Sequence, residues 1–161
     1  MNNEWEKIYK KNSFREKNKW PNEDLISFIM RKYGNTKNKN KINILELGCG
    51  WGNNLRLLKD LNFNYFGIDQ SKTATNYCKK YYKNIFCCNF SEIPFGDQFF
   101  DIVLDRQSIQ HNDKFSINNI FSEIHRILKK RGLLYSHLIS KSSYKVKTHH
   151  FKVNEIKKFL K

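Results

Sequence analysis

Residues 44–52 of the chain read Ile-Leu-Glu-Leu-Gly-Cys-Gly-Trp-Gly, and this stretch limits the fold more than any other. An apolar strand runs into three glycines spaced G-x-G-x-G, and residues 53–61 have the pattern of a helix. Glycines suit such a turn because they adopt positive φ angles and allow a ligand to approach the backbone closely. The stretch therefore predicts a strand, a ligand-binding loop and a helix in succession.

A second predicted strand, residues 65–68, ends in Asp69, seventeen positions after Gly52. A carboxylate at that distance is placed to accept hydrogen bonds from both hydroxyls of a ribose. The dinucleotide-binding pattern G-x-G-x-x-G does not fit, because the third glycine comes one residue early. In addition, Glu46 stands two residues before the first glycine. These features together predict a nucleoside-binding βαβ unit.

This combination resembles motif I and the following acidic position of the class I S-adenosylmethionine-dependent methyltransferases. The resemblance extends over roughly residues 20–160 and is strongest from 44 to 111. It implies S-adenosyl-L-methionine as the cofactor and a first set of residues that hold it. That set is Glu46, Gly48, Cys49, Gly50, Gly52, Asp69 and Gln70. The alternative is a Rossmann-like fold in which the glycine loop is only a turn.

Residues 89–103 contain a second motif, which reads NFSEIPF and, after three further residues, FFDIV. It is similar to the pattern D-A-x-x-L-P-F…F-D-x-V of small-molecule methyltransferases. In that family the first position is commonly Asp, which bonds the adenine amino group; Asn89 departs from this, but its amide oxygen can accept the same bond. The resemblance implies that Phe90 flanks the adenine ring, whereas the later phenylalanines are expected to pack within the loop.

A fourth strand is expected at residues 101–105, and its carboxyl end lies beside the switch point of an open α/β sheet. The resemblance puts the methionine part of the cofactor there. Asp105 is therefore a candidate contact to the ammonium or sulfonium charge, and a strand end in solvent is the alternative. His111 lies where the family often has a histidine near the substrate, so it is the candidate general base or substrate orienter. The alternative for His111 is a capping or exposed loop histidine.

Strands and helices alternate through the rest of the chain, which is the pattern of a parallel sheet covered on both faces. We expect an α/β fold, a Rossmann-like three-layer sandwich with a mainly parallel sheet, over a core of residues 42–161. An apolar stripe predicts a helix that reaches Leu128 and ends at Gly132, followed by a fifth strand at 133–139 and a short helix at 153–160.

The segment after the fifth strand, residues 140–161, is polar and basic. It cannot supply the two further core strands that the family fold normally has. The sheet is therefore expected to be shortened at its C-terminal strands, and its exposed edge is a candidate surface for oligomer formation or for a partner chain.

Residues 1–41 are predicted to form two helices and a polar linker. The first helix contains Trp5 and Tyr9, and the second starts at Trp20-Pro21. Their aromatic content suits a substrate lid, although an ordinary packing seam explains it equally well. Trp51, inside the glycine loop, is a candidate for a cation–π contact with the sulfonium or for packing on a helix.

The net charge of +15 raises the question of a nucleic-acid partner. Lysine and asparagine gather outside the predicted core strands, and a genome rich in adenine and thymine would produce the same bias. The N-P-P-Y type of motif used for adenine methylation is missing, since the chain reads Asp-Arg-Gln-Ser at 105–108. We therefore expect a small molecule or a glycan precursor as the acceptor, at oxygen or nitrogen. The alternatives are an RNA methyltransferase and a cofactor-binding pseudo-enzyme that docks on a partner.

The four cysteines are Cys49, Cys78, Cys87 and Cys88, and no two of them form a C-x-x-C pair. No zinc site is therefore expected, and no carboxylate cluster suggests another metal. Reduced thiols suit a cytoplasmic protein. No apolar run approaches membrane-spanning length and the N-terminus has no secretory signal, so we expect no membrane association.

Overall fold

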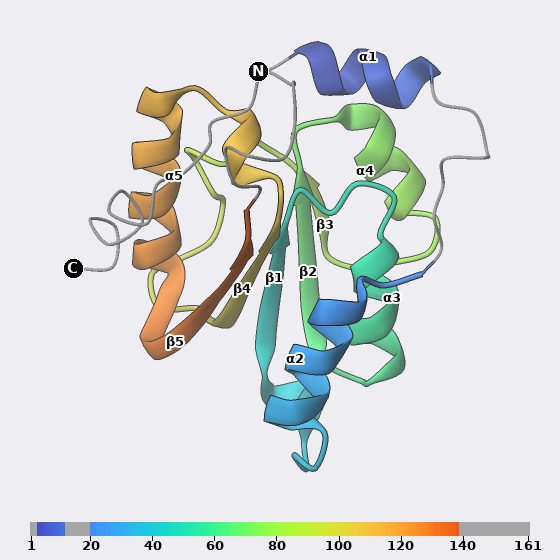
Figure 1. Ribbon diagram of the computed structural model, residues 1–161, viewed down its shortest axis with the longest axis vertical. Coiled ribbons are helices and arrows are strands. Elements are labelled where there is room, and N and C mark those ends of the chain that lie inside the picture. The colour runs from blue at the N-terminus through green and yellow to red at the C-terminus, as the bar shows by residue number, and fades with distance from the viewer. Residues whose placement is uncertain (1–2, 12–19, 139–161) are drawn as a thin grey trace.

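Helices and strands alternate as the sequence predicts in a computed structural model that describes residues 3–11 and 20–138 (Figure 1). The elements are α1 (Asn3–Lys11), α2 (Glu23–Tyr33), η2 (Lys39–Lys41), β1 (Asn43–Leu47), α3 (Asn53–Asp60), β2 (Asn64–Asp69), α4 (Lys72–Cys78), β3 (Ile85–Cys87), β4 (Phe100–Arg106), η3 (Ile109–His111), α5 (Lys114–Ile127) and β5 (Leu128–His137). The short helix expected at 153–160 lies outside the described residues.

The five strands form one sheet in the order β3-β2-β1-β4-β5, and every neighbouring pair is parallel. Helix α5 covers one face of the sheet, and α2, α3 and α4 cover the other (Figure 1). A cluster of buried apolar side chains fills each interface between sheet and helices. The expected three-layer α/β sandwich is confirmed.

The central strand β1 explains why this sequence favours a parallel sheet. Its residues Ile44, Leu45 and Leu47 are completely buried. A strand covered on both faces needs such a continuous apolar run, because it has no solvent-facing side. Glu46 interrupts the run and is only 3% exposed, so a carboxyl group lies in the middle of the fold.

The boundary between α5 and β5 differs from the prediction. The helix ends at Ile127, and Leu128, which was expected on its apolar stripe, pairs with Phe100 in the sheet. The next pair is Ile102 with Leu133, so residues 129–132 of β5 lie opposite a single residue of β4 at a register shift. The prediction that Gly132 ends the helix is wrong, because sheet pairing outweighs the helical periodicity of this segment.

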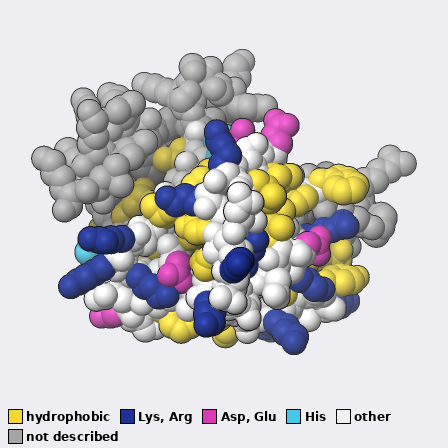
Figure 2. All heavy atoms as spheres, turned by 90° about the horizontal axis from the view of Figure 1, so that it is seen from below, with side chains coloured by type: hydrophobic (Ala, Val, Ile, Leu, Met, Phe, Trp, Pro, Cys, Tyr) yellow, Lys and Arg dark blue, Asp and Glu magenta, His cyan; other side chains and the backbone are white. Residues whose placement is uncertain are grey.

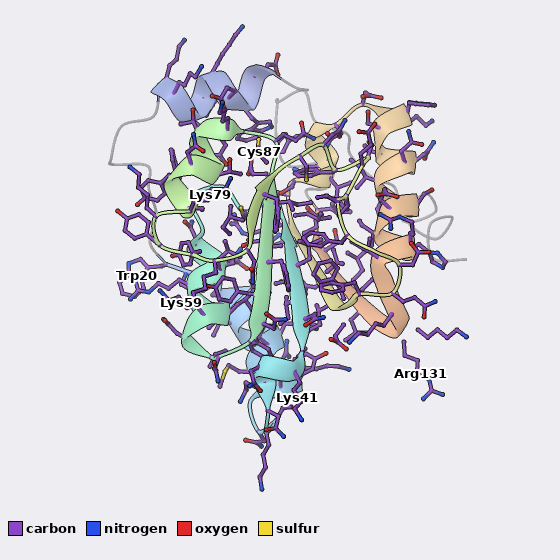
Figure 3. The ribbon with its side chains drawn as sticks, turned by 180° about the vertical axis from the view of Figure 1, so that it is seen from behind. Trp20, Lys41, Lys59, Lys79, Cys87 and Arg131 are labelled. Atoms are coloured by element: carbon purple, nitrogen blue, oxygen red, sulfur yellow. The ribbon has the colours of Figure 1, made fainter. Side chains whose placement is uncertain are left out.

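The second helix begins at Glu23 and not at Trp20-Pro21. The side chain of Asn22 accepts a hydrogen bond of 3.2 Å from the backbone N–H of Leu25, which makes Asn22 the N-cap. Trp20 precedes the helix and is largely exposed on the outside of the molecule (Figure 3).

The two N-terminal helices occupy different places. Helix α1 lies across the end of the molecule where the strands finish, next to α4 (Figure 1). Helix α2 packs against the sheet and buries Leu25 and Ile29. Of the region 1–41 that was predicted to form a lid, α1 is therefore the part that reaches this end of the sheet. In the described part of the chain, no helix is both long and apolar enough to cross a membrane.

Candidate functional site

A cavity of about 240 Å³ lies at the carboxyl ends of β1, β2 and β4, where open α/β sheets bind their ligands. Its walls come from the glycine loop, from residues that follow β2, β3 and β4, and from α1. Eight of the predicted site residues line it: Glu46, Gly48, Cys49, Gly50, Asp69, Gln70, Phe90 and His111. Three other predicted residues, Gly52, Asn89 and Asp105, are not part of its lining.

The glycine loop adopts the left-handed backbone that its composition suggests. Gly48 and Gly50 have φ angles of 67° and 52°. A Cβ atom at Gly48 would overlap the Ser108 side chain, and one at Gly50 would lie 2.7 Å from the Tyr9 hydroxyl. Gly52 has the same type of backbone, but it is the N-cap of α3 and is not part of the cavity lining.

Asp69, at the end of β2, is hydrogen-bonded to the glycine loop, and these are the two features that predict a nucleoside site. One carboxylate oxygen accepts a hydrogen bond of 2.9 Å from the Gly50 N–H, and the other accepts one of 2.8 Å from the Ser71 N–H. Burial raises the pKa of Asp69, and the backbone N–H groups counteract that rise. The carboxylate is thus fixed against the loop, with acceptor capacity remaining on both oxygens.

Glu46 presents an unsatisfied acceptor to the cavity. Its Oε1 accepts a hydrogen bond of 2.7 Å from the Asn54 side-chain amide, whereas its Oε2 is buried without a hydrogen-bond partner among the described residues. The Asn53 Oδ1 atom, also at the cavity, is in the same state. Burial raises the pKa of Glu46 to about 8. A cationic group bound in the cavity would supply hydrogen-bond donors to both of these oxygens.

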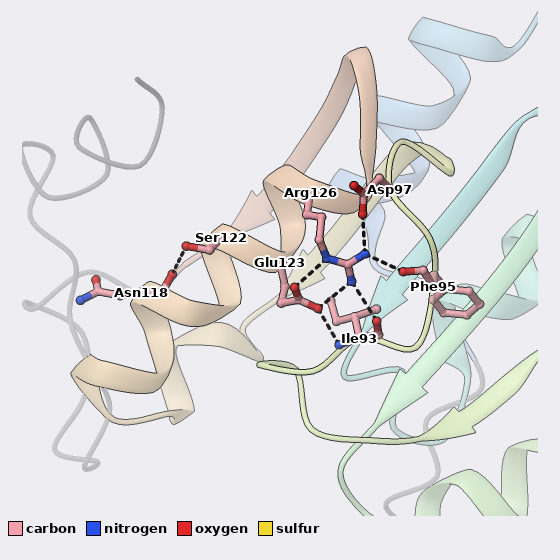
Figure 4. Close-up of polar contacts among 7 residues, drawn as sticks. All are labelled: Ile93, Phe95, Asp97, Asn118, Ser122, Glu123 and Arg126. Carbon is pink, nitrogen blue, oxygen red and sulfur yellow. Dashed lines mark hydrogen bonds and ion pairs between the residues drawn. The ribbon is translucent and has the colours of Figure 1, made fainter.

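The loop after β3 forms the wall that contains Phe90, whose side chain is 4% exposed. Arg126 on α5 holds this loop: its guanidinium donates to the carbonyl oxygens of Ile93 and Phe95 and pairs with Asp97 and Glu123 (Figure 4). Glu123 in turn accepts a hydrogen bond of 2.8 Å from the Ile93 N–H. The wall is therefore tied to α5 by charge-assisted bonds.

Asn89 and Asp105 are engaged in local structure. Asn89 Oδ1 accepts a hydrogen bond of 3.1 Å from the Ser91 N–H. Asp105 is fully buried and accepts from the N–H groups of Ser108 and Ile109 and from the Ser136 hydroxyl. The alternative in which Asp105 ends a strand in solvent is wrong, because its side chain instead organises the turn after β4.

His111 lines the cavity from the short helix η3, and the Oδ1 atom of the next residue, Asn112, accepts a hydrogen bond of 3.2 Å from the Gln70 side-chain amide. Its ring meets the ring of Trp5 edge to face, with centroids 4.8 Å apart. Burial lowers the pKa of His111, so that the neutral imidazole is favoured near neutral pH. The ring is half-buried at the cavity wall, which differs from the alternative of an exposed loop histidine.

Helix α1 closes one side of the cavity with Trp5 and Tyr9. Tyr9 packs edge to face on Trp51, with centroids 4.9 Å apart, and Trp51 packs on Tyr77. Glu6 fastens the helix to α4, since its carboxylate accepts hydrogen bonds from the hydroxyl groups of Ser71 and Thr73 at 2.6 and 2.7 Å. Both uses considered for Trp51 remain compatible with this position, because it lines the cavity and packs on neighbouring rings.

Several cavity residues were not among the predicted site residues: Asn53, Asn54, Arg106, Gln107, Ser108 and Asn112. The signal for Asn53 and Asn54 was available, since two amides directly follow the glycine loop at the start of a helix. Asn112 reaches the site through a contact with Gln70, from which it is 42 positions distant, so the local sequence does not indicate its role.

The Cys49 thiol, which lines the cavity, is unsuited to metal binding. Cys49 and Cys78 are buried and free, and a hydrogen bond between them, together with burial, raises the pKa of the Cys49 thiol. A thiol must lose its proton to bind a metal. Within residues 3–11 and 20–138, no group of histidine, cysteine and carboxylate side chains has the arrangement of a metal site.

Comparison with known proteins agrees with this arrangement. The profile of the methyltransferase domain family matches residues 45–136. An uncharacterized protein of Methanocaldococcus jannaschii is 33% identical over 120 residues, which are 73% of this chain and 48% of that protein. The 24-methylenesterol C-methyltransferase 2 of Arabidopsis thaliana is 27% identical over 103 residues, 58% of this chain and 28% of that enzyme.

Among solved structures, the fold is similar to a SAM-dependent methyltransferase from Archaeoglobus fulgidus. The TM-score is 0.68 at 21% sequence identity, over 85% of this chain and 66% of the other. The chain spans about half the length, or less, of the two curated relatives named above. The matched part contains the glycine loop, Asp69 and the residues that follow β4.

Proposed function

Because the chain belongs to the class I S-adenosylmethionine-dependent methyltransferases, its cofactor is S-adenosylmethionine, and we propose that it methylates an oxygen or nitrogen atom of a small molecule or glycan precursor. The single observation that carries the proposal is the cavity in which the glycine loop, Asp69 and the orphaned oxygen of Glu46 meet. It contains the chemical groups needed for a nucleoside and for a cation side by side.

The cation half of the site fits the amino acid part of the cofactor. Glu46 Oε2 and Asn53 Oδ1 are buried acceptors without partners among the described residues, and an ammonium group would satisfy both. Gly48 and Gly50 line the same cavity, where the Ser108 and Tyr9 side chains approach them closely. We propose that these residues, with Cys49 as part of the loop, hold the methionine end.

The nucleoside half of the site lies toward β2 and β3. We propose that Asp69 accepts hydrogen bonds from the ribose hydroxyls and that Phe90 packs on the adenine ring, with Gln70 beside them. Roles for Gly52, Asn89 and Asp105 are indirect in this proposal: Gly52 starts α3, and the two polar side chains shape the turns next to the cavity.

The cofactor supplies an activated methyl group, so the protein mainly has to align the acceptor and exclude water. We propose that His111 accepts the proton of the acceptor, because its neutral form is favoured and it lies in the cavity wall. Helix α1 serves as the lid over this half, since Trp5 contacts His111 and Glu6 fastens the helix to α4. Four free thiols suit a cytoplasmic location.

An RNA acceptor is the second candidate because of the net charge of +15. Within the described residues, the labelled basic side chains Lys41, Lys59, Lys79 and Arg131 project from separate parts of the molecule (Figure 3). On the face shown in Figure 2, Lys and Arg side chains alternate with hydrophobic and uncharged ones. Dispersed charge of this kind is weaker support for a nucleic-acid site than a continuous basic stripe.

The test is transfer of a labelled methyl group from S-adenosylmethionine to a cell extract that is afterwards separated into RNA, protein, lipid and small molecules. We expect label in the small-molecule or glycan fraction, on oxygen or nitrogen. Label in RNA would favour the second candidate. Cofactor binding without any transfer would identify a pseudo-enzyme, and label on carbon would contradict the proposed chemistry.

A further inference from the structure

Arg106 is the last residue of β4, and its exposed side chain lines the cavity together with His111 and Trp5. Among residues 3–11 and 20–138, no hydrogen bond or ion pair reaches its guanidinium group. In the described part of the chain, no other lysine or arginine lines the cavity, and several of them have acidic partners, such as Lys129 with Asp101. Arg106 is therefore a positive charge at the cavity with unused donors.

The neighbouring acidic groups do not neutralise Arg106. Asp105 uses its carboxylate for Ser108, Ile109 and Ser136. Successive residues of a strand point to opposite faces, so the Asp105 and Arg106 side chains diverge. Glu46 is close enough to interact electrostatically with Arg106, but its free oxygen is the acceptor assigned above to the cofactor ammonium.

The strand order places Arg106 beyond the cofactor half of the cavity. Asp69 ends β2, Glu46 belongs to the adjacent β1, and Arg106 ends β4 on the other side of β1. A ligand that runs from Asp69 to Glu46 therefore reaches Arg106 only at its far end. His111 also follows β4 in the chain and lines the cavity, so we assign it with Arg106 to the acceptor half.

A second donor accompanies Arg106. The next residue, Gln107, lines the cavity and has a φ angle of 62°, an uncommon conformation for a residue other than glycine. Its backbone N–H bonds to His137, and no hydrogen bond within the described residues engages its side-chain amide. An arginine and a free amide at one wall form a suitable site for a carboxylate or a phosphate.

We propose that Arg106, assisted by Gln107, binds an anionic group of the methyl acceptor, so that the substrate is a carboxylate or phosphate compound. This inference rests on the proposed function, because it assumes that the cofactor occupies the half with Asp69 and Glu46. The cofactor also has a carboxylate, and the experiment separates these two sources of negative charge.

The experiment compares the unmodified protein with Arg106→Ala and with Arg31→Ala, a matched removal of an exposed arginine on α2. The first arm measures the affinity for S-adenosylhomocysteine and for 5′-methylthioadenosine, which lacks the amino acid group. The second arm titrates benzoate, phenyl phosphate and neutral benzamide, with and without S-adenosylhomocysteine, and follows the fluorescence of Trp5 and Trp51 at the cavity.

We expect the two anions to bind better than benzamide, and Arg106→Ala to weaken their binding roughly tenfold or more, since bonds to charged groups are strong. Both nucleoside ligands should bind Arg106→Ala as they bind the unmodified protein. The proposal is overturned if Arg106→Ala weakens the binding of S-adenosylhomocysteine but not that of 5′-methylthioadenosine or of the anions. It is also overturned if benzoate and phenyl phosphate bind no better than benzamide. If neither nucleoside ligand binds the unmodified protein, the proposed function is refuted. This outcome can be told apart from failure of the Arg106 proposal, because the anions are also titrated without S-adenosylhomocysteine.

Discussion

The Asp69 carboxylate accepts a hydrogen bond of 2.9 Å from the backbone N–H of Gly50, which connects the end of β2 directly to the glycine loop. The other oxygen of the same carboxylate holds the Ser71 N–H at the start of α4. One side chain thus fixes the relative positions of a strand, a loop and a helix around the cavity. The proposed ribose contact and the shape of the site both depend on it.

Asp69→Ala should weaken S-adenosylhomocysteine binding roughly tenfold or more, because it removes charged acceptors from the ribose and frees the loop. Asp69→Asn retains one acceptor oxygen and should lose less. Isothermal titration calorimetry measures both. Asp60→Ala, which removes an exposed carboxylate on α3, is the control and should not change the affinity. Equal affinity of Asp69→Ala and the unmodified protein would remove Asp69 from the site.

Glu46 makes the stability of the free protein depend on pH. Its pKa is about 8 in the folded protein and near 4.5 when it is exposed, so the folded state retains a proton that the unfolded chain releases. The free energy of unfolding should therefore fall as pH rises from 4.5 to about 8. Glu46→Gln cannot ionise, and it should be more stable relative to the unmodified protein at pH 8 than at pH 5.

Urea denaturation at both pH values measures this difference, with the exposed loop variant Glu92→Gln as a control. Glu46→Gln should also bind S-adenosylhomocysteine more weakly, because the ammonium loses its ionised partner. Calorimetry of the unmodified protein near pH 7, in buffers of different ionisation enthalpy, should detect proton release on binding. An unchanged pH slope in Glu46→Gln, or binding without proton release, would contradict this account.

Glu6→Gln should loosen helix α1, because a neutral amide replaces the carboxylate that accepts hydrogen bonds from Ser71 and Thr73. These bonds lower the pKa of Glu6 to about 2, so they should persist at all but strongly acidic pH. We expect faster amide hydrogen exchange in residues 3–11 and faster dissociation of S-adenosylhomocysteine. Lys7→Gln, an exposed change on the same helix, should have neither effect. If both variants behave alike, Glu6 does not fasten the lid.

His111→Gln should lower kcat by roughly a hundredfold with an oxygen acceptor, which is typical of the loss of a general base. Burial lowers the pKa of His111 below 6.5, so the rate should rise with pH through a value below 6.5 and then level off. The variant should lack this rise. His125→Gln, on the exposed side of α5, should retain it. A pH profile that is the same in His111→Gln would assign His111 a structural role.

The sequence allowed the central part of the fold to be predicted because local pattern and tertiary structure agree there. Three glycines after an apolar strand and an acid at the end of the next strand have few structural solutions. The loop and Asp69 accordingly lie where they were expected. At Leu128 local pattern and tertiary structure disagree. The helical pattern of apolar residues includes Leu128, but in the folded protein this residue pairs with Phe100 in the sheet.

The contacts between distant segments could not be predicted in the same way. Glu6 precedes Thr73 by 67 positions, and nothing in either local sequence indicates that they meet. The burial of Asp105 depends on Ser136 of the neighbouring strand β5. The Arg106 guanidinium has no hydrogen-bond or ion-pair partner within residues 3–11 and 20–138, and this depends on how the folded chain arranges the acidic groups around it.

The most direct measurement for the whole account is calorimetric titration of the unmodified chain with S-adenosylmethionine, accompanied by thermal unfolding at the same ligand concentrations. The cavity that combines the glycine loop, Asp69 and Glu46 predicts saturable heat with one site per chain and a melting temperature that rises with ligand concentration. Absence of both heat and a thermal shift at millimolar ligand would contradict the central claim.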